Sequence, residues 1–303
     1  MKKFKKTLSS IIVFVFVILY TFLSGDLEET TIETNKEEKN QGKIEKVLNE
    51  TLEVHFLDVG QADSILILTE DKAGLIDAGN SSDGDDIVNY IKNLGITTLD
   101  FVVGTHPHED HIGGIDEVIN SFNVGKYYMP DAMTTTKTFE NVLDALANKN
   151  LKYTVPKIGS TFNLGSAKFE TIYLGTDTKD LNNTSIVLKM TFGNKSFLFT
   201  GDATDVSEEK MLDKNIKVDV LKVGHHGSEY STTDKFLNKV NPSISIISVG
   251  KDNKYGHPSK KTLDKLKNTK IYRTDLDKTI IIKTDGNKLD VKKIDESING
   301  KEN

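Results

Sequence analysis

Side chains that can bind a metal ion gather in the segment 105–114. It reads Thr-His-Pro-His-Glu-Asp-His-Ile-Gly-Gly and directly follows the apolar stretch 99–104. Three imidazoles and a carboxylate are costly to bring so close together unless a divalent cation holds them, and these side chains suit zinc, manganese or iron. The whole chain has seven histidines, so a polar surface loop with this content is the weaker interpretation. The ligand candidates are His106, His108, Asp110 and His111.

Two further segments end in side chains of the same kind. The apolar stretch 197–203 carries the carboxylate of Asp202 near its end, and the stretch 220–228 runs into His225 and His226. Alone, the first segment would more often be a simple turn, and the second would be a surface loop as often as a ligand loop. Together with the histidine-rich segment they predict one shared metal site, because strand ends at one sheet edge can converge on one point.

The elements that position these segments are short apolar strands, each of which runs into a ligand loop. Gly113 and Gly114 let the backbone pass close to the first loop and begin the next helix. Strands are predicted at 52–59, 63–70, 73–78, 99–105, 124–129, 151–156, 167–174, 184–192, 195–200, 217–223, 244–249, 270–274, 278–284 and 287–293. Helices are predicted at 84–94, 115–122, 137–149, 205–214, 232–240 and 259–268. Early hairpins followed by strand–helix alternation favour an α/β fold in which two mixed β-sheets pack together with helices outside.

The composition excludes several classes of site. The chain has 303 residues, of which 37% are hydrophobic and 28% charged, as in an ordinary globular protein. Its net charge of −6 provides no general surface for polyanions, so contact with nucleic acid would come from a local basic stripe or from bound metal. The absence of cysteine excludes disulfides, thiolate zinc sites and cysteine nucleophiles.

The N-terminus has the layout of an export signal. Four lysines within the first six residues precede an apolar run at 11–23, which is typical of a signal peptide. The run is short for a membrane span and only a fair cleavage site follows, so residues 1–24 are either a signal peptide or an N-terminal membrane anchor. Because the lysines would stay cytoplasmic, we expect the rest of the chain to be secreted or tethered to the outer face of the cytoplasmic membrane. The membrane would be a partner only through an uncleaved anchor.

Three further regions follow from the composition along the chain. Residues 25–50 are rich in Glu, Lys, Asn and Thr and are predicted to form a polar flexible linker. Residues 51–295 carry the predicted strands and helices and would form the folded domain, followed by a polar tail at 296–303. No protein partner is predicted.

These motifs resemble the metallo-β-lactamase superfamily and, more narrowly, the hydrolase domain at the C-terminus of ComEC-type competence proteins. The narrower resemblance rests on His-Phe-Leu-Asp-Val-Gly-Gln-Ala-Asp-Ser-Ile at 55–65, Leu-Ile-Asp-Ala-Gly at 75–79, Asn-Asn-Thr-Ser-Ile-Val-Leu at 182–188, His-His-Gly-Ser at 225–228 and Tyr-Gly-His-Pro-Ser at 255–259. It covers roughly residues 52–285. It implies an αββα sandwich and a hydrolase that uses two divalent metal ions, zinc or manganese.

The resemblance also implies an arrangement of the ligands. His106 and His108 would bind one metal ion, and Asp110 and His111 would bind the other. Asp202 would bridge the two ions. Two ions close together lower the pKa of a bound water, so that hydroxide can attack an electrophilic centre near neutral pH. Asp110 could also take the proton of this water.

The last ligands are less definite in this resemblance. One of His225 and His226 would complete the second site, and His226 is preferred because relatives place the ligand directly before a small residue, here Gly227. His225 would then support the site or contact the substrate. Where many relatives supply a third histidine to the first ion, this chain has Asn182 and Asn183, whose amide oxygens are weaker ligands.

Five other residues are candidates for supporting roles. Asp58 and Asp77 end early strands and are expected to orient ligand histidines, although Asp77 could equally lie in a simple turn. His257 is a candidate for substrate contact or for protonation of the leaving group, and is otherwise a surface histidine. Arg273 could hold a phosphate, and Ser228 could support the site or the substrate.

The function that this reasoning favours is an exported dinuclear-metal hydrolase of phosphodiesters, a nuclease or phosphodiesterase that could act on DNA. One alternative keeps the fold with another substrate: a phosphocholine or cell-wall ester, a lactone or a β-lactam. A third alternative is a binding module without catalysis. Lysines near the ligand loops could supply phosphate contacts, namely Lys222, Lys251, Lys254, Lys260 and Lys261.

Overall fold

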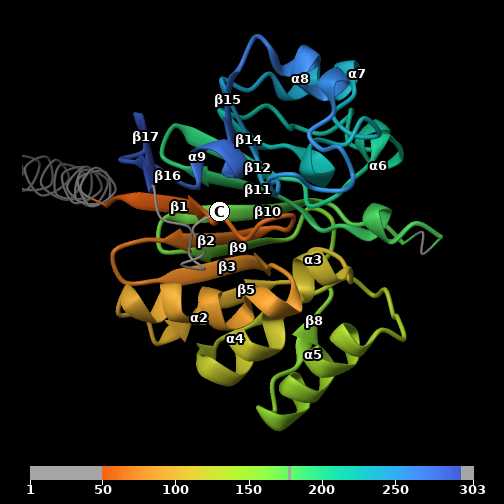
Figure 1. Cartoon of the computed structure of the whole chain (residues 1–303). Coiled ribbons are helices and arrows are strands. Elements are labelled where there is room, and N and C mark those ends of the chain that lie inside the picture. The colour runs from red at the N-terminus through yellow and green to blue at the C-terminus, as the bar shows by residue number, and fades with distance from the viewer. Residues whose placement is uncertain (1–49, 177–178, 295–303) are drawn as a thin grey trace, which may run out of the picture. The chain divides into compact units, whose positions relative to one another are not determined.

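Two β-sheets lie face to face between two layers of helices (Figure 1). The computed structural model describes residues 50–176 and 179–294. The predicted leader, nearly all of the linker and the polar tail therefore lie outside the described residues. Among the helices that are described, none combines the length and the apolar character that crossing a membrane requires.

The first sheet has eight strands in the order β17-β16-β1-β2-β3-β5-β7-β8. Its strands are β1 (Leu52–Phe56), β2 (Ser64–Leu68), β3 (Ala73–Ala78), β5 (Phe101–Val103), β7 (Tyr127–Tyr128), β8 (Tyr153–Thr154), β16 (Thr279–Thr284) and β17 (Leu289–Ile294). Strands β3, β5, β7 and β8 run parallel, and the other pairs are antiparallel. The C-terminal hairpin completes this sheet, because β16 pairs with β1.

The second sheet has seven strands in the order β15-β14-β13-β12-β11-β10-β9. Its strands are β9 (Thr161–Leu164), β10 (Ala167–Tyr173), β11 (Val187–Phe192), β12 (Lys195–Phe199), β13 (Val220–Lys222), β14 (Ile244–Ile247) and β15 (Lys270–Arg273). Strands β12 to β15 are parallel neighbours. A separate two-stranded ribbon pairs β4 (Thr98–Leu99) with β6 (Asn123–Val124). Both large sheets are therefore mixed.

The helices cover the outer faces of the two sheets (Figure 1). On the first sheet lie α2 (Gly84–Asn93), α3 (Glu109–Ile112), α4 (Ile115–Ser121) and α5 (Lys137–Asn148). On the second sheet lie α6 (Asp205–Glu209), α7 (Asp234–Val240) and α8 (Lys260–Leu266), while α9 (Thr274–Asp277) joins β15 to β16. Three short 3-10 helices complete the described elements: η1 (Ser81–Asp83), η2 (Leu181–Thr184) and η3 (Gly224–Gly227).

Three hydrophobic clusters hold the four layers together. The first lies between the sheets and joins side chains such as Phe56 and Ile76 to Phe169 and Phe199. The second packs the first sheet against its helices, and the third does the same for the second sheet, where Phe236 of α7 is buried. Central strands such as β3, β13 and β14 thus bury side chains on both faces, which explains their continuous apolar runs in the sequence.

The predicted α/β fold of two mixed sheets with helices outside is confirmed. Several boundaries differ from the prediction. The helix expected at 205–214 ends at Glu209, and the strand expected at 184–192 begins only at Val187 because η2 precedes it. Strand β9 and the short helices α3 and α9 were missed, because a four-residue element shows too little periodicity to be recognised.

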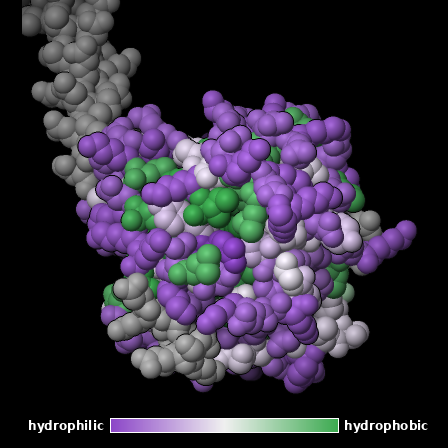
Figure 2. Space-filling model, turned by 45° about the horizontal axis from the view of Figure 1, so that its top comes forward, coloured by the Kyte–Doolittle hydropathy of each residue, from purple (hydrophilic) through white to green (hydrophobic). Residues whose placement is uncertain are grey.

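The surface seen in Figure 2 is mainly hydrophilic, with hydrophobic side chains gathered in a few small patches. Single exposed apolar residues such as Leu276, 68% exposed, are ordinary on folded proteins. The more specific feature of this molecule is polar and lies at the strand ends.

Candidate metal centre

The three ligand segments meet where strands of both sheets end. His106 and His108 follow β5, Asp202 follows β12, and His226 lies in η3 after β13. The three segments meet as predicted, but the prediction that they meet at the edge of one sheet was wrong. Strand β5 belongs to the first sheet, whereas β12 and β13 belong to the second. The site therefore depends on the packing of one sheet against the other.

Two glycines allow the first ligand loop to lie close to its neighbours. A Cβ atom on Gly113 would lie 2.2 Å from backbone atoms of Asn80 and Ser81, and one on Gly114 would lie 2.6 Å from the carbonyl oxygen of Ala78. Real Cβ atoms do not approach backbone so closely. The predicted close passage of the backbone at these glycines is confirmed.

Four side chains form a group that can hold a metal ion. Asp110, His111, Asp202 and His226 each offer one ligand atom, and these atoms all lie within 4.8 Å of one another. Nε2 of His111 is 3.2 Å from Oδ1 of Asp202. Nε2 of His226 is 3.3 Å from Oδ2 of Asp110 and 3.5 Å from Oδ2 of Asp202. Ligands about 2.1 Å from a tetrahedral ion are about 3.4 Å apart, so the spacing fits a divalent cation.

Several of these ligand atoms are buried without a hydrogen bond. They are Nε2 of His111, Nε2 of His226 and Oδ1 of Asp202. They approach one another closely, yet their orientations do not satisfy hydrogen-bond geometry. A buried polar atom without a partner is costly in a folded protein, whereas coordination of one cation would satisfy all three. The residues present therefore fit a divalent metal ion.

The structure separates the roles of the two neighbouring histidines. Nδ1 of His226 lies 2.9 Å from the carbonyl oxygen of Ser248. A carbonyl oxygen can only accept, so Nδ1 carries the proton and Nε2 faces the carboxylates of Asp110 and Asp202. The side chain of His225 is 25% exposed, and its Nε2 is 3.7 Å from Oδ2 of Asp202. This geometry favours His226 as the ligand.

Asp77 lies where it can orient a ligand, as predicted from the sequence. Its Oδ2 is 2.8 Å from Nδ1 of His111. Asp77 also accepts hydrogen bonds from the backbone N–H of Thr105 at 2.7 Å and from its hydroxyl at 2.8 Å. A carboxylate on Nδ1 holds an imidazole ring so that Nε2 is directed toward a metal. Asp77 thus connects β3 to the first ligand loop.

The backbone is left-handed at three non-glycine residues of this site. The φ angles are 59° at Asp77, 49° at His225 and 52° at His226. This conformation costs a non-glycine residue about 1 kcal/mol or more, and proteins keep it where the surrounding contacts impose it, often at functional sites. Here it turns the two histidines sharply after β13 and directs His226 into the ligand group.

The carboxylates dominate the electrostatics of the site. Burial alone would lower the pKa of His111, but the carboxylates of Asp202 and Asp77 raise it well above its usual value. Burial would also lower the pKa of His226, but the carboxylates of Asp202 and Asp110 outweigh it and raise this pKa. In turn His111 and His226 hold the pKa of Asp202 well below its usual range despite burial. The imidazoles thus hold protons that a metal ion would replace.

His106 and His108 form a pair beside this group. Nε2 of His106 is 3.0 Å from Nδ1 of His108, and the ring centres of His106 and His111 are 4.1 Å apart. The hydroxyls of Thr105 and Ser185 lie 3.2 and 3.4 Å from Nδ1 of His106. Burial, together with His111, lowers the pKa of His106 well below its usual value. The ring is therefore neutral and able to coordinate.

A hollow of about 350 Å³ opens beside the ligand atoms. Its lining includes the candidate ligands His108, Asp110, Asp202 and His226, and also Gln61, Glu109, Asn182, His225, Tyr255 and His257. The structure thus brings His257, predicted as a substrate contact, to the same hollow. The ring centres of His225 and His257 are 5.5 Å apart.

Comparison with known proteins decides the family. Residues 57–251 match the model of the metallo-β-lactamase superfamily. The chain belongs to this superfamily. It is therefore a hydrolase of a metal-binding fold, with candidate ligands among its histidine and aspartate side chains, and the family predicted from the motifs is confirmed.

The relatives of the chain include Competence protein ComA of Neisseria gonorrhoeae, to which it is 29% identical over 227 residues, covering 72% of this chain and 30% of that protein. The chain is 32% identical over 251 residues to ComE operon protein 3 of Bacillus subtilis, covering 75% of this chain and 32% of that protein. It is 29% identical over 221 residues to Recombination protein 2 of Haemophilus influenzae, covering 71% of this chain and 26% of that protein. The chain thus spans about a third or less of the length of these curated relatives.

A solved structure shares the fold. The metallo-β-lactamase fold protein YhfI of Bacillus subtilis is similar with a TM-score of 0.51 at 13% identity, covering 78% of this chain and 99% of that one. At this identity the likeness bears on the fold alone.

A buried ion pair behind the ligands was not recognised in the sequence. Nζ of Lys222 is 2.8 Å from Oδ2 of Asp63, and these side chains are 0% and 1% exposed. Oδ1 of Asp63 is 3.5 Å from Nδ1 of His226. The expectation that Lys222 contacts a phosphate was wrong, because its ammonium group is enclosed and also donates to the carbonyl oxygen of Val223. A lysine inside an apolar strand was the available signal, since such a lysine requires a buried partner.

The two asparagines that replace a third histidine have different surroundings. Oδ1 of Asn182 is buried without a hydrogen-bond partner, and Asn182 lines the hollow. Oδ1 of Asn183 instead accepts hydrogen bonds from the hydroxyls of Thr204 and Ser207, both at 2.7 Å. The structure therefore places Asn182 at the site, and Asn183 serves to connect η2 with the start of α6.

Three other candidates lie away from the ligands. Asp58 was expected to orient a histidine, but its Oδ2 is 3.6 Å from Nζ of Lys278. Arg273 was expected to hold a phosphate, but its guanidinium forms two hydrogen bonds with the carboxylate of Asp275. Ser228 is buried, and its hydroxyl accepts a hydrogen bond from the backbone of Tyr230 at 3.3 Å. None of these three residues is among the described residues that line the metal-binding hollow.

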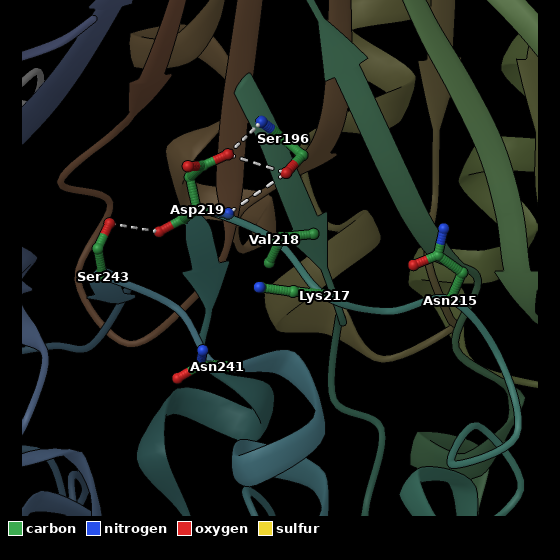
Figure 3. A pocket seen from close by; sticks show the side chains of 7 residues that line it. All are labelled: Ser196, Asn215, Lys217, Val218, Asp219, Asn241 and Ser243. Carbon is green, nitrogen blue, oxygen red and sulfur yellow. Dashed lines mark hydrogen bonds between the residues drawn. The ribbon is translucent and has the colours of Figure 1, made fainter. Parts of the chain in front are cut away.

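A separate hollow of about 320 Å³ lies at the opposite ends of β12, β13 and β14 (Figure 3). Three of its polar residues, Ser196, Asp219 and Ser243, are joined by hydrogen bonds. The carboxylate of Asp219 accepts hydrogen bonds from the backbone and hydroxyl of Ser196, and its carbonyl oxygen accepts one from the hydroxyl of Ser243. Since its lining includes no imidazole, the metal chemistry belongs to the hollow beside Asp202.

Proposed function

We propose that this domain hydrolyses phosphodiesters, with nucleic acid as the substrate class and two divalent ions, zinc or manganese, as cofactors. The ligands of one ion would be Asp110, His111, Asp202 and His226, and those of the other His106, His108 and Asp202. The observation that carries the proposal is the group of four ligand atoms within 4.8 Å of one another at an open hollow. Similarity to competence proteins supports nucleic acid as the substrate.

The bound ions would supply hydroxide near neutral pH and would neutralise charge on the phosphate. The side chains of the domain position this chemistry. His111 and His226 present Nε2, because Asp77 and a backbone carbonyl occupy their Nδ1 atoms. The side chain of Asp110 is 29% exposed, so this carboxylate both faces His226 and reaches the hollow, where it can take a proton from water.

His225 and His257 form part of the wall around the reacting phosphate. Burial, together with His225, lowers the pKa of His257 to about 4, so its ring is neutral at pH 7. A neutral imidazole is a hydrogen-bond donor but a poor acid for a leaving group. Of the two roles predicted for His257, substrate contact is therefore the one that we propose.

We also propose that the domain acts outside the cytoplasm. The lysine-rich start of the chain and the apolar run at 11–23 support this location, because signal peptides and N-terminal anchors share that layout.

The test combines metal analysis with an assay of diester cleavage. The purified full-length chain is expected to retain zinc or manganese and to hydrolyse bis-p-nitrophenyl phosphate. Asp202→Ala should lower the rate more than about 100-fold, because even residues that only support a ligand contribute 10- to 100-fold. The matched control is Asp213→Ala, which removes an aspartate that is 73% exposed.

Three results would overturn the proposal. Turnover of nitrocefin without turnover of the diester would indicate a β-lactam hydrolase, and turnover of a lactone or phosphocholine ester alone would indicate a hydrolase whose substrate is not nucleic acid. Bound metal without turnover of any of these compounds would indicate a binding module.

A further inference from the structure

A second hollow, of about 400 Å³, lies against the metal-binding hollow. Its lining consists of Gln61, Asn80, Glu109, Asp110, Asn253, Lys254 and Tyr255. Gln61, Glu109, Asp110 and Tyr255 also line the metal-binding hollow, so the two share a wall. A substrate whose phosphate lies at the ligands can therefore extend past Tyr255 into the second hollow.

Tyr255 presents an aromatic ring at this shared wall. The side chain is 59% exposed, although the ring packs against His257 with centres 5.8 Å apart and planes 25° from parallel. Nζ of Lys254 is 5.2 Å from the centre of the same ring. An aromatic ring that remains more than half exposed between two hollows can accept a further planar group.

The loop that carries Tyr255 is held by its own hydrogen bonds. Oδ1 of Asn253 accepts from the backbone N–H groups of Tyr255 and His257 at 3.2 and 3.1 Å. Its Nδ2 donates to the carbonyl oxygens of Gly250 and His257 at 2.9 and 2.6 Å. The backbone N–H of Gly250 in turn donates to Gln61 at 3.1 Å. The backbone that carries the ring is therefore held in place before any ligand binds, which lowers the entropic cost of binding.

The chemistry of the second hollow fits a nucleobase better than a phosphate. The carboxylates of Glu109 and Asp110 outnumber the single cation of the lining, Lys254, and would repel a second phosphate, whereas the carboxylate of Glu109 can accept hydrogen bonds from the amino group of a base. The amides of Gln61 and Asn80 can both donate to and accept from a base edge. Stacking on an aromatic side chain tolerates any base, because every base has a π-face.

We propose that Tyr255 stacks an unpaired base next to the phosphodiester that lies at the metal ligands. This inference rests on the proposed phosphodiesterase function and narrows its substrate to single-stranded nucleic acid. A base that stacks on Tyr255 is not stacked in a duplex, so double strands bind only after local unpairing, which costs a few kcal/mol.

The experiment uses the full-length, metal-loaded chain and two DNA strands of equal length. One carries 2-aminopurine, a base whose fluorescence falls when it stacks on an aromatic ring, and the other carries an abasic residue at that place. Tyr255→Ala should weaken binding of the first strand about 5- to 150-fold and remove the fluorescence decrease, because one base–aromatic stack contributes about 1–3 kcal/mol. Binding of the abasic strand should hardly change, and Tyr255→Phe should behave as the unaltered chain does.

The control variant is Tyr230→Ala, which removes a tyrosine that is 67% exposed, against 59% for Tyr255, and that lines neither hollow. Tyr255→Ala could instead weaken binding of the 2-aminopurine strand and the abasic strand alike, or of neither strand. If the chain still cleaves DNA in that case, the inference is wrong and the proposed function stands. Equal cleavage of single strands and duplexes would also overturn it. If the chain cleaves no phosphodiester, the proposed function fails and the inference fails with it.

Discussion

Replacing Lys222 by methionine tests whether its ion pair with Asp63 supports the metal centre. Lys222→Met keeps an unbranched side chain in β13 but removes the ammonium group that lies 2.8 Å from Oδ2 of Asp63 and 2.9 Å from the carbonyl oxygen of Val223. The carboxylate of Asp63, 1% exposed, would remain buried without its cation.

The expected loss follows from the burial of both partners. Removing one partner of a buried ion pair costs about 3–5 kcal/mol, because the remaining charge stays desolvated. For a domain of this size each kcal/mol lowers the melting temperature by about 2–4 °C, so a decrease of about 6–20 °C is expected. Removing the stranded charge as well, in the double variant Lys222→Met with Asp63→Asn, should recover much of this loss.

Calorimetry of the metal-free chain measures these differences, and the same scan with added zinc or manganese gives a second result. A cation near His226 would compensate the carboxylate of Asp63, which is 3.5 Å from that histidine, so metal should stabilise Lys222→Met more than it stabilises the unaltered chain. The reasoning is refuted if Lys222→Met melts within 2 °C of the unaltered chain, or if the double variant is no more stable than the single one.

Three shorter predictions follow from other parts of the fold. Gly113→Ala should destabilise the chain by about 3 kcal/mol or more in urea unfolding, since its Cβ would lie 2.2 Å from neighbouring backbone atoms. Burial raises the pKa of Glu117 from 4.5 to about 7, so the folded chain binds an extra proton between these values and its stability falls as pH rises through them. Glu117→Gln should remove this decrease and raise the free energy of unfolding by about 1 kcal/mol at pH 8, after discounting for solvent exposure. If stability depends on pH in the same way in this variant as in the unaltered chain, Glu117 is not the group responsible. Because carboxylates raise the pKa of His111 and His226, metal binding should release protons and weaken as pH falls; calorimetry in buffers of different ionisation enthalpy measures this release, and identical heats in all buffers would exclude it.

The parts of the site that the sequence predicted share one property: each is local. The histidine-rich loop after β5, the carboxylate after β12 and the histidines after β13 are short motifs that directly follow apolar strands. Strand–helix alternation is also local, and it was sufficient to predict the two mixed sheets. Family resemblance then related these motifs to one another.

The parts that were missed depend on residues distant in the sequence. Asp63 directly precedes β2 of the first sheet and Lys222 ends β13 of the second, and neither segment shows that its charge has a partner. Asn182 and Asn183 are adjacent and identical in type, yet only packing against Thr204 and Ser207 separates their roles. Arg273 was mistaken for a phosphate ligand because its short-range pairing with Asp275 depends on the turn into α9.

The sequence by itself determined which side chains can bind metal and that strands would deliver them, because ligand type and hydrophobic period are properties of short segments. Only the tertiary structure decided that the ligands come from two sheets, that Nδ1 of His226 is held by the carbonyl oxygen of Ser248, and that Tyr255 stands between two hollows. Those features depend on the packing of the layers and on backbone conformation, which set distances between atoms that no local pattern specifies.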